Sequence, residues 1–268
     1  MGARDEVVSK GPLAPVVAPI DFRRYPVTGE AAALVRHYWL VDYALPPGAS
    51  HDVPILVYPA CNLVIEHDRA RLYAPTPDLT VRHLEGSGFA FGVLLQVATG
   101  YRLAGRPVED FVGDSIDFSD EHVVTEVRDI MGASEDAVAR HPSAIAAFEE
   151  WLAARVPSLT TDERLMNEIA AAIETDAALT RVDELAGRFG LSPRRLERLA
   201  ARYVGLTPKW MIQRRRLQEA AARLGASSTT DLSGLAAELG YADYPHFSRD
   251  FAATVGMTPR DFAATLKR

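Results

Sequence analysis

Residues 185–208 read LAGRFGLSPRRLERLAARYVGLTP, and residues 235–259 read LAAELGYADYPHFSRDFAATVGMTP. Both blocks begin with Leu-Ala, place a glycine four residues after that alanine, and close on Gly-x-Thr-Pro behind a helical stretch. Two helices joined by a tight, glycine-containing turn require this order of residues. The repeat therefore predicts two helix-turn-helix units near the end of the chain.

In the first unit, Gly190 is expected to end the leading helix, because a left-handed residue is most favourable there when it lacks a β-carbon. Ser192 as N-cap and Pro193 in the first turn then start the second helix. Leu196 and Ala200 share its inner face, which leaves the polar side chains on the outer side. The outward residues expected to read DNA bases are Arg194, Arg195, Glu197 and Arg198.

In the second unit, Asp243 is the expected N-cap, and the outward residues expected to read bases are Tyr244, His246, Ser248 and Arg249. Arginine can donate a bidentate pair to guanine O6 and N7, while Ser, His and Glu can address other base edges in the major groove. The alternative is that both faces are merely solvated. The repetition favours DNA, because Arg198 and Arg249 each lie two residues after an inner apolar residue.

Between the units, Thr207-Pro208 opens a long helix over residues 209–224. A helix of about 17 residues spans roughly 25 Å. A spacer of that order can hold two reading helices in successive major-groove segments, about 34 Å apart. The residues expected to contact DNA phosphates are Arg202, Lys209, Arg214 and Arg215.

Charge divides the chain into two unequal parts. Residues 1–175 hold 14 Lys+Arg and 26 Asp+Glu, a net charge of -12, whereas residues 176–268 hold 15 and 10, a net charge of +5. Such asymmetry is typical of a nucleic-acid-binding module joined to another domain. The apolar runs are too short for a membrane span, and the acidic start of the chain does not resemble a secretory signal. With one cysteine in the sequence, we expect a cytoplasmic protein without disulfides and without a membrane partner.

The chain is expected to fold as an α+β protein in four parts. Residues 1–20, rich in Pro, Ala and Gly, predict a flexible arm. Short β-branched and aromatic runs bounded by turn residues predict a β-rich, barrel-like regulatory domain over residues 21–118. Helical periodicity predicts a connector over residues 119–160, which is also a candidate dimerisation surface. Residues 161–268 form the expected all-helical DNA-binding domain.

Three kinds of site are conceivable in the β-rich part. His51, His67 and His83, with Glu66 and Asp68, lack a tight His-x-His spacing, so we predict neither a metal site nor any other cofactor. Cys61 could sense oxidants, although a lone cysteine is usually a small buried hydrophobe. Aromatic residues could line an effector pocket or simply fill the core. The candidate pocket residues are Trp39, Tyr43, Tyr58, Cys61, Phe89, Phe91 and Tyr101.

The segments LAGRFGLSPRRLERL, RRRLQEAAARL and LAAELGYADYPHFSRDF with VGMTP resemble the AraC/XylS family of transcription regulators. The resemblance implies that residues around Leu196 and Phe247 enter the grooves. The sequence departs from the family at Ala200, where a large aromatic is common, and at Tyr244-Pro245, where a small polar pair is common. The N-terminal half resembles the β-rich, cupin-like sensory domains of some members, which implies binding of a small-molecule effector or dimerisation.

These observations predict a sequence-specific DNA-binding transcription regulator rather than an enzyme. Its expected partners are double-stranded DNA, a small-molecule effector and, if it is an activator, RNA polymerase. A monomer and a homodimer both remain open. The alternatives are a cupin-type metal-dependent enzyme and an oligomerisation module, each fused to a DNA-binding domain. A DNA alkyl-transfer protein would need a cluster of metal-bound cysteines, which a single cysteine cannot supply.

Overall fold

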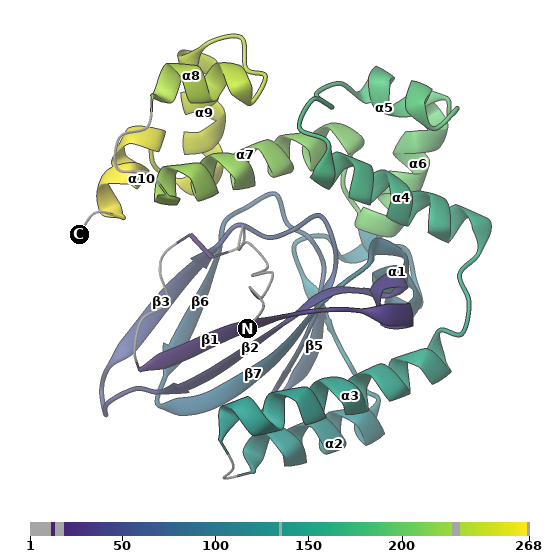
Figure 1. Ribbon diagram of the computed structural model, residues 1–268, viewed down its shortest axis with the longest axis vertical. Helices are drawn as coiled ribbons and strands as arrows, with labels where there is room; N and C mark the ends of the chain where they lie inside the picture. Colours follow the sequence, from purple (N-terminus) through teal and green to yellow (C-terminus); the bar gives the residue numbers. More distant parts are fainter. Residues whose placement is uncertain (1–11, 14–18, 134–135, 227–230, 267–268) are drawn as a thin grey trace, which may run out of the picture.

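The computed structural model describes residues 12–13, 19–133, 136–226 and 231–266 (Figure 1). Within them the N-terminal part contains two antiparallel sheets rather than one closed barrel. The larger sheet has the strand order β1 (Ile20–Pro26), β2 (Val35–Ala44), β7 (Ser87–Leu95), β4 (Asn62–Glu66), β5 (Ala70–Tyr73) and β8 (Ser115–Asp117). The smaller sheet pairs β3 (Ser50–Ile55) with β6 (Thr80–Glu85).

The two faces of the larger sheet pack against different partners, because successive side chains along a strand alternate between faces. One face packs on α2 (Glu121–Gly132) and α3 (Ala137–Arg155), where the buried rings of Tyr38 and Phe91 on the sheet contact each other and Phe148 of α3. On the other face, an apolar cluster joins the larger sheet to β3 and β6. Here Trp39 lies across Gly92 of the neighbouring strand, where a Cβ would overlap the indole ring.

Short helices connect β7 to β8. They are α1 (Val97–Ala104) and the 3-10 helix η2 (Val108–Phe111); another 3-10 helix, η1 (Gly29–Ala33), lies between β1 and β2. Helix α4 (Thr161–Thr175) begins with a capping box, in which the Thr160 hydroxyl accepts from the Glu163 amide and the Glu163 carboxylate accepts from the Thr160 amide. The capping box therefore satisfies two backbone donors at this helix start, the amides of Thr160 and Glu163.

The repeated blocks form two helix-turn-helix units joined by α7 (Pro208–Ala226), as the sequence predicts. The first unit is α5 (Val182–Arg188) with α6 (Pro193–Val204), and the second is α8 (Leu232–Glu238) with α9 (Tyr244–Val255), followed by α10 (Pro259–Thr265). Ser192 and Asp243 cap α6 and α9 through their side chains, as expected. The predicted α+β fold is confirmed.

The two parts of the chain share apolar clusters. Ala60, Leu94 and Val97 are buried in one cluster with residues of α4, α6 and α7. Leu56 is buried in another with residues of α7, α8 and α9. Figure 1 shows α7 running across the ends of the strands, with one helix-turn-helix unit at each end of it.

Most of the arm expected over residues 1–20 lies outside the described residues. Pro12 forms an isolated bridge with Ile55, and Leu13 is buried and donates its amide to the Pro54 carbonyl (2.9 Å). None of the described helices combines the length and apolar character of a membrane span.

Candidate nucleic-acid interface

Helix α6 exposes one polar face. Its inner face is apolar and buried, and Leu196 and Ala200 are fully buried there as expected. This pattern turns four predicted base-reading residues outward, all of them exposed: Arg194, Arg195, Glu197 and Arg198. Arg195 donates from Nη2 to Asp162 Oδ1 on α4 (3.0 Å), an exposed pair that solvent screens. The other two arginines of this face, Arg194 and Arg198, are exposed to solvent.

Helix α9 is built in the same way around larger side chains. Phe247 and Phe251 are fully buried, and their rings contact each other. Of the four predicted base-reading residues, His246 and Arg249 are exposed, while Tyr244 and Ser248 are partly exposed. The His246 ring packs edge-on against buried Tyr241, with ring centroids 5.2 Å apart.

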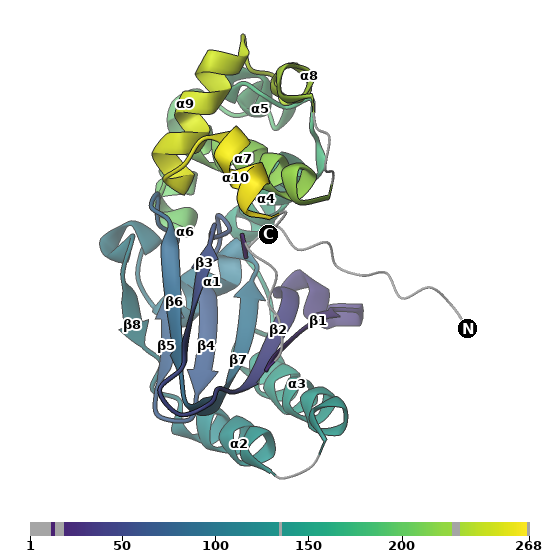
Figure 2. The same cartoon turned by 90° about the vertical axis from the view of Figure 1, so that its left-hand side faces the viewer.

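Both outward faces can meet one partner. Figure 2 shows α6 and α9 on the same side of α7. Each helix has a proline in its first turn, Pro193 as the first residue of α6 and Pro245 as the second residue of α9. A helix N-terminus that presents arginines is the geometry by which helix-turn-helix proteins enter the major groove. The structure therefore places the two groups of residues that the repeat singled out on one side of α7, one group toward each end of that helix.

The predicted phosphate contacts do not all lie on the surface. Lys209 is exposed, but Arg214 and Arg215 are buried, so including them among the phosphate contacts was wrong for this conformation. Arg215 donates from Nη2 to the carbonyls of Ala177 (3.3 Å) and Leu179 (3.2 Å) in the α4–α5 connection. The spacing of Arg214 and Arg215 along α7 does not indicate that they are buried, because the groups that cover them come from distant parts of the chain.

Arg202 is exposed but already engaged. It donates to the Tyr101 hydroxyl, and its guanidinium carbon lies 4.8 Å from the centre of that ring. Close by, Arg102 donates from Nη2 to Glu163 Oε2 (2.9 Å). These residues line an open cavity of about 650 Å³ between α1, α4 and α6.

Burial and hydrogen bonding act in opposite directions on Glu163. Burial favours the neutral acid, but hydrogen bonds from Arg102 and from Thr160 outweigh it and lower the pKa of Glu163 to about 2. The carboxylate is therefore ionised at neutral pH, and it joins the end of α1 to the start of α4.

The seven candidate effector residues do not form one pocket. Trp39 and Tyr43 pack against the cluster between the two sheets. Phe89 and Phe91 belong to the opposite face of the larger sheet, in the core under α2 and α3, so grouping them with Trp39 was wrong. The alternation of side chains along β7 and β2 is the reason.

Three further candidates lie elsewhere. Tyr58 packs edge-on against buried His37, with ring centroids 5.8 Å apart. Tyr101 lines the cavity beside α6. Cys61 is buried, and burial raises the pKa of its thiol to about 12, which disfavours the reactive thiolate.

The histidines considered for a metal have different surroundings, and His51 lies on β3 opposite Leu84 of β6. His83 lies between Asp52 and Glu85 on the exposed face of the small sheet, with Nδ1 2.6 Å from Asp52 Oδ1. His67 lies beside Asp68, 3.9 Å away. In the described part of the chain, no group of three or more His, Cys, Asp or Glu side chains is placed to hold a metal ion.

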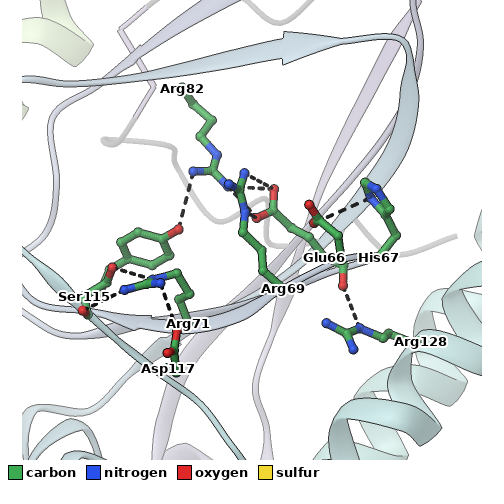
Figure 3. Close-up of polar contacts among 10 residues, drawn as sticks. Glu66, His67, Arg69, Arg71, Arg82, Ser115, Asp117 and Arg128 are labelled. Carbon is green, nitrogen blue, oxygen red and sulfur yellow. Dashed lines mark hydrogen bonds and ion pairs between the residues drawn. The ribbon is translucent and has the colours of Figure 1, made fainter.

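A charged network that sequence patterns do not indicate joins the two sheets (Figure 3). Glu66 on β4 accepts from Arg82 on β6 with both carboxylate oxygens (2.6 Å each), and from Arg69 (2.5 Å). Burial acts to raise the pKa of Glu66, but these hydrogen bonds hold it below its usual value. The Arg128 side chain of α2 donates to the Glu66 carbonyl (2.8 Å). Arg69 is three residues from Glu66, but Arg82 lies on a strand of the other sheet, so no local pattern could have identified the Glu66–Arg82 pair.

Two family models match the chain: a helix-turn-helix domain over residues 185–265 and a domain of unknown function (DUF6597) over residues 23–117. The HTH-type transcriptional activator RhaS of Escherichia fergusonii is 32% identical over 153 residues, covering 53% of this chain and 55% of RhaS. RhaS of Klebsiella pneumoniae is 30% identical over 145 residues, covering 52% and 51%. The chain thus spans about half the length of the curated relatives it matches. Among solved structures, apo ToxT from Vibrio cholerae aligns with a TM-score of 0.48 and 12% identity over 85% of this chain and 97% of ToxT.

Proposed function

We propose that the chain is a cytoplasmic, sequence-specific DNA-binding regulator of the AraC/XylS family, since residues 185–265 match a helix-turn-helix family model and part of the chain is similar to the activator RhaS. The observation that carries the proposal is the pair of helices α6 and α9, each with an exposed polar face and a proline in its first turn, on one side of α7 (Figure 2). Each presents an arginine two residues after its first fully buried apolar residue, Arg198 after Leu196 and Arg249 after Phe247.

The two reading helices differ in chemistry. α6 offers three arginines and one glutamate, whereas α9 offers tyrosine, histidine, serine and one arginine. Different side chains prefer different base edges. We therefore expect one chain to recognise an asymmetric site of two adjacent, unlike segments, with exposed Lys209 contacting phosphate.

Regulation is proposed to act through the N-terminal domain, whose residue span 23–117 matches a family model of its own. Trp39 and Tyr43 between the sheets, and Tyr101 in the cavity beside α6, are the positions at which a small-molecule effector would be sought first. Helices α2 and α3 are the candidate dimerisation surface. Contact with RNA polymerase belongs to the proposal if the protein is an activator, and the proposal includes no catalytic step.

Selection of bound genomic fragments followed by footprinting tests the proposal. The expected result is a recurrent asymmetric site, protected in two segments about one helical turn apart. Affinity for this site should fall steeply as salt rises, because phosphate contacts release counterions. Equal affinity for selected and random DNA would contradict sequence-specific recognition.

A further inference from the structure

The centre of α7 is held by the N-terminal domain through two donors one helical turn apart. Arg214 donates from Nη2 to the backbone carbonyls of residues 76 and 77, at 3.0 and 2.7 Å. Gln218 donates from Nε2 to the carbonyls of residues 56 and 57, at 3.0 and 3.3 Å. Both side chains are almost fully buried, with 2% and 3% of their surface exposed. Because i and i+4 lie on one face of a helix, the two contacts act together.

The contacts of Arg214 and Gln218 are hydrogen bonds, and this determines how precisely they fix the position of α7. Apolar packing is not directional, whereas a hydrogen bond requires a particular distance and angle. Arg214 leaves Nε and Nη1 without a hydrogen-bond partner among the described residues, and burial lowers its pKa to about 10. Burying a guanidinium in this way is unfavourable. An apolar side chain would pack the helix at lower cost, but it would fix neither its rotation nor its position along the sheet ends.

The first helix-turn-helix unit is held to the same domain at a second place. Gly205 ends α6 with φ +82°, against the segment 108–112. A Cβ at this position would overlap the Val112 side chain and come within 3.0 Å of the Val108 carbonyl oxygen. Arg202, on the last turn of α6, donates to Tyr101 of α1. The close approach of the two backbones fixes the C-terminal end of α6 against the N-terminal domain.

The second unit is held at a third place, through Leu56. Its carbonyl accepts from Gln218, while its side chain is fully buried in the cluster that contains Phe247 and Phe251 of α9. Leu79 packs against the same cluster. One domain thus contacts the first unit, the connecting helix and the second unit.

We propose that the N-terminal domain sets the distance and orientation between the two DNA-reading helices, with Arg214 and Gln218 as the positioning residues. This inference rests on the proposed function. It assigns to the domain a part in site selection: a chain with these contacts accepts one spacing of the two DNA segments and rejects others. Each added base pair moves the second segment along the axis and around it, so a rigid pair of helices cannot follow.

A spacing series tests this. The probes are duplexes made from the selected site, in which the distance between the two protected segments is changed one base pair at a time. Wild-type protein should bind the original spacing about tenfold more tightly than its neighbours, the size of effect that a mismatched contact produces. Arg214→Met and Gln218→Leu should each reduce this ratio toward one. Arg223→Met is the control, because this exposed arginine pairs with Glu219 and Glu238 outside the N-terminal domain.

The outcomes separate the competing roles. If the variants bind more weakly but keep the same preferred spacing, the two residues serve only folding, and the inference is overturned. If they bind every spacing more tightly by one factor, the domain obstructs DNA rather than positioning the helices, which also overturns it. Circular dichroism identifies a variant that fails to fold, and Gln218→Leu, which conserves most of the side-chain volume, then carries the test.

A second measurement needs no DNA. Spin labels are attached to Asp183→Cys on α5 and Ala237→Cys on α8, both exposed, in a background with Cys61→Ala. Wild-type protein should give one narrow label-to-label distance, and Arg214→Met a broad distribution. A distribution that is equally narrow in both overturns the inference. If the wild type binds no specific DNA but shows the narrow distance, the proposed function fails while the positioning role stands.

Discussion

Two glycines occupy equivalent positions in the repeat but have different surroundings. Gly205 ends α6 and Gly256 ends α9, each with φ +82°. A Cβ at Gly256 meets no described atom within 4 Å, whereas one at Gly205 overlaps Val112 of the N-terminal domain. Comparing Gly205 with Gly256 therefore distinguishes the effect of backbone strain from the effect of contact with the N-terminal domain.

We expect Gly256→Ala to lower the free energy of unfolding by about 1–2 kcal/mol, the cost of a side chain in the left-handed region. Gly205→Ala should lower it by more, because the same strain is joined by displacement of the segment 108–112. Urea unfolding of both variants measures the difference. Equal losses would show that α6 can move away from the N-terminal domain without cost.

Glu163 should make stability depend on pH. Its pKa lies at about 2 in the folded protein, below the usual 4.5. The ionised group therefore stabilises the fold above pH 4.5, and this contribution is lost as the pH falls toward 2. It amounts to about 3–4 kcal/mol at most, since one pKa unit corresponds to about 1.4 kcal/mol.

The matched variant is Glu163→Gln, which keeps the side-chain volume and one acceptor but does not titrate. Between pH 5 and pH 3, wild-type protein should lose stability more steeply than the variant in urea titrations. Other carboxylates titrate in both proteins, so the difference in slope reports Glu163. Parallel pH profiles would contradict the lowered pKa.

At the scale of the helices, α6 and α9 should act as separate readers. Replacing Arg198 or Arg249 with Ala should cost about 1–3 kcal/mol of DNA-binding free energy, because each removes a base contact. Specificity should relax in one segment of the site for Arg198→Ala and in the other for Arg249→Ala. Binding to a library randomised over both segments measures this. Unchanged base preferences in both variants would contradict the groove assignment.

The helices of the repeat were predictable from the sequence because their signals are local. Capping by Ser192 and Asp243 and the apolar stripes of α6 and α9 depend on residues within a few positions. The burial of Arg214 was not predictable. Its acceptors, residues 76 and 77, lie more than 130 positions away, and backbone carbonyls have no residue-type signature. Helical periodicity shows which side chains share a face, but not what covers that face.

The sheets show the same limit. Runs of β-branched and aromatic residues predicted strands, but strand pairing determines which face each residue joins. β2 pairs with β7 across a wide gap in sequence, so Trp39 faces Gly92 while Phe91 faces the helices. The candidate pocket residues were therefore chosen by residue type alone. The ion network of Glu66 and Arg82 was missed for the same reason.

At the scale of the whole molecule, two apolar clusters contain residues of both the N-terminal domain and the helical C-terminal part. Leu94 and Val97 of the N-terminal part are buried with residues of α4 and α6, and Leu56 is buried with residues of α7 and α9. Separating the parts would expose both clusters to water at about 25 cal/mol for each Å² of apolar surface. It is therefore unfavourable for the N-terminal domain or the helical C-terminal part to unfold while the other remains folded.

We therefore expect the described domains to unfold in one cooperative transition. Trp39, which donates to Asn62 between the sheets (3.0 Å), and Trp210, which packs against Arg214 on α7, report on the two parts. Variants that keep one of them, with the other tryptophans changed to Phe, should each show coincident fluorescence and far-UV circular dichroism transitions in urea. Separate midpoints for the two tryptophans would mean that the shared clusters do not couple the parts. The N-terminal domain could then not hold the reading helices at a fixed spacing, because a contact that opens independently imposes no geometry on its neighbour.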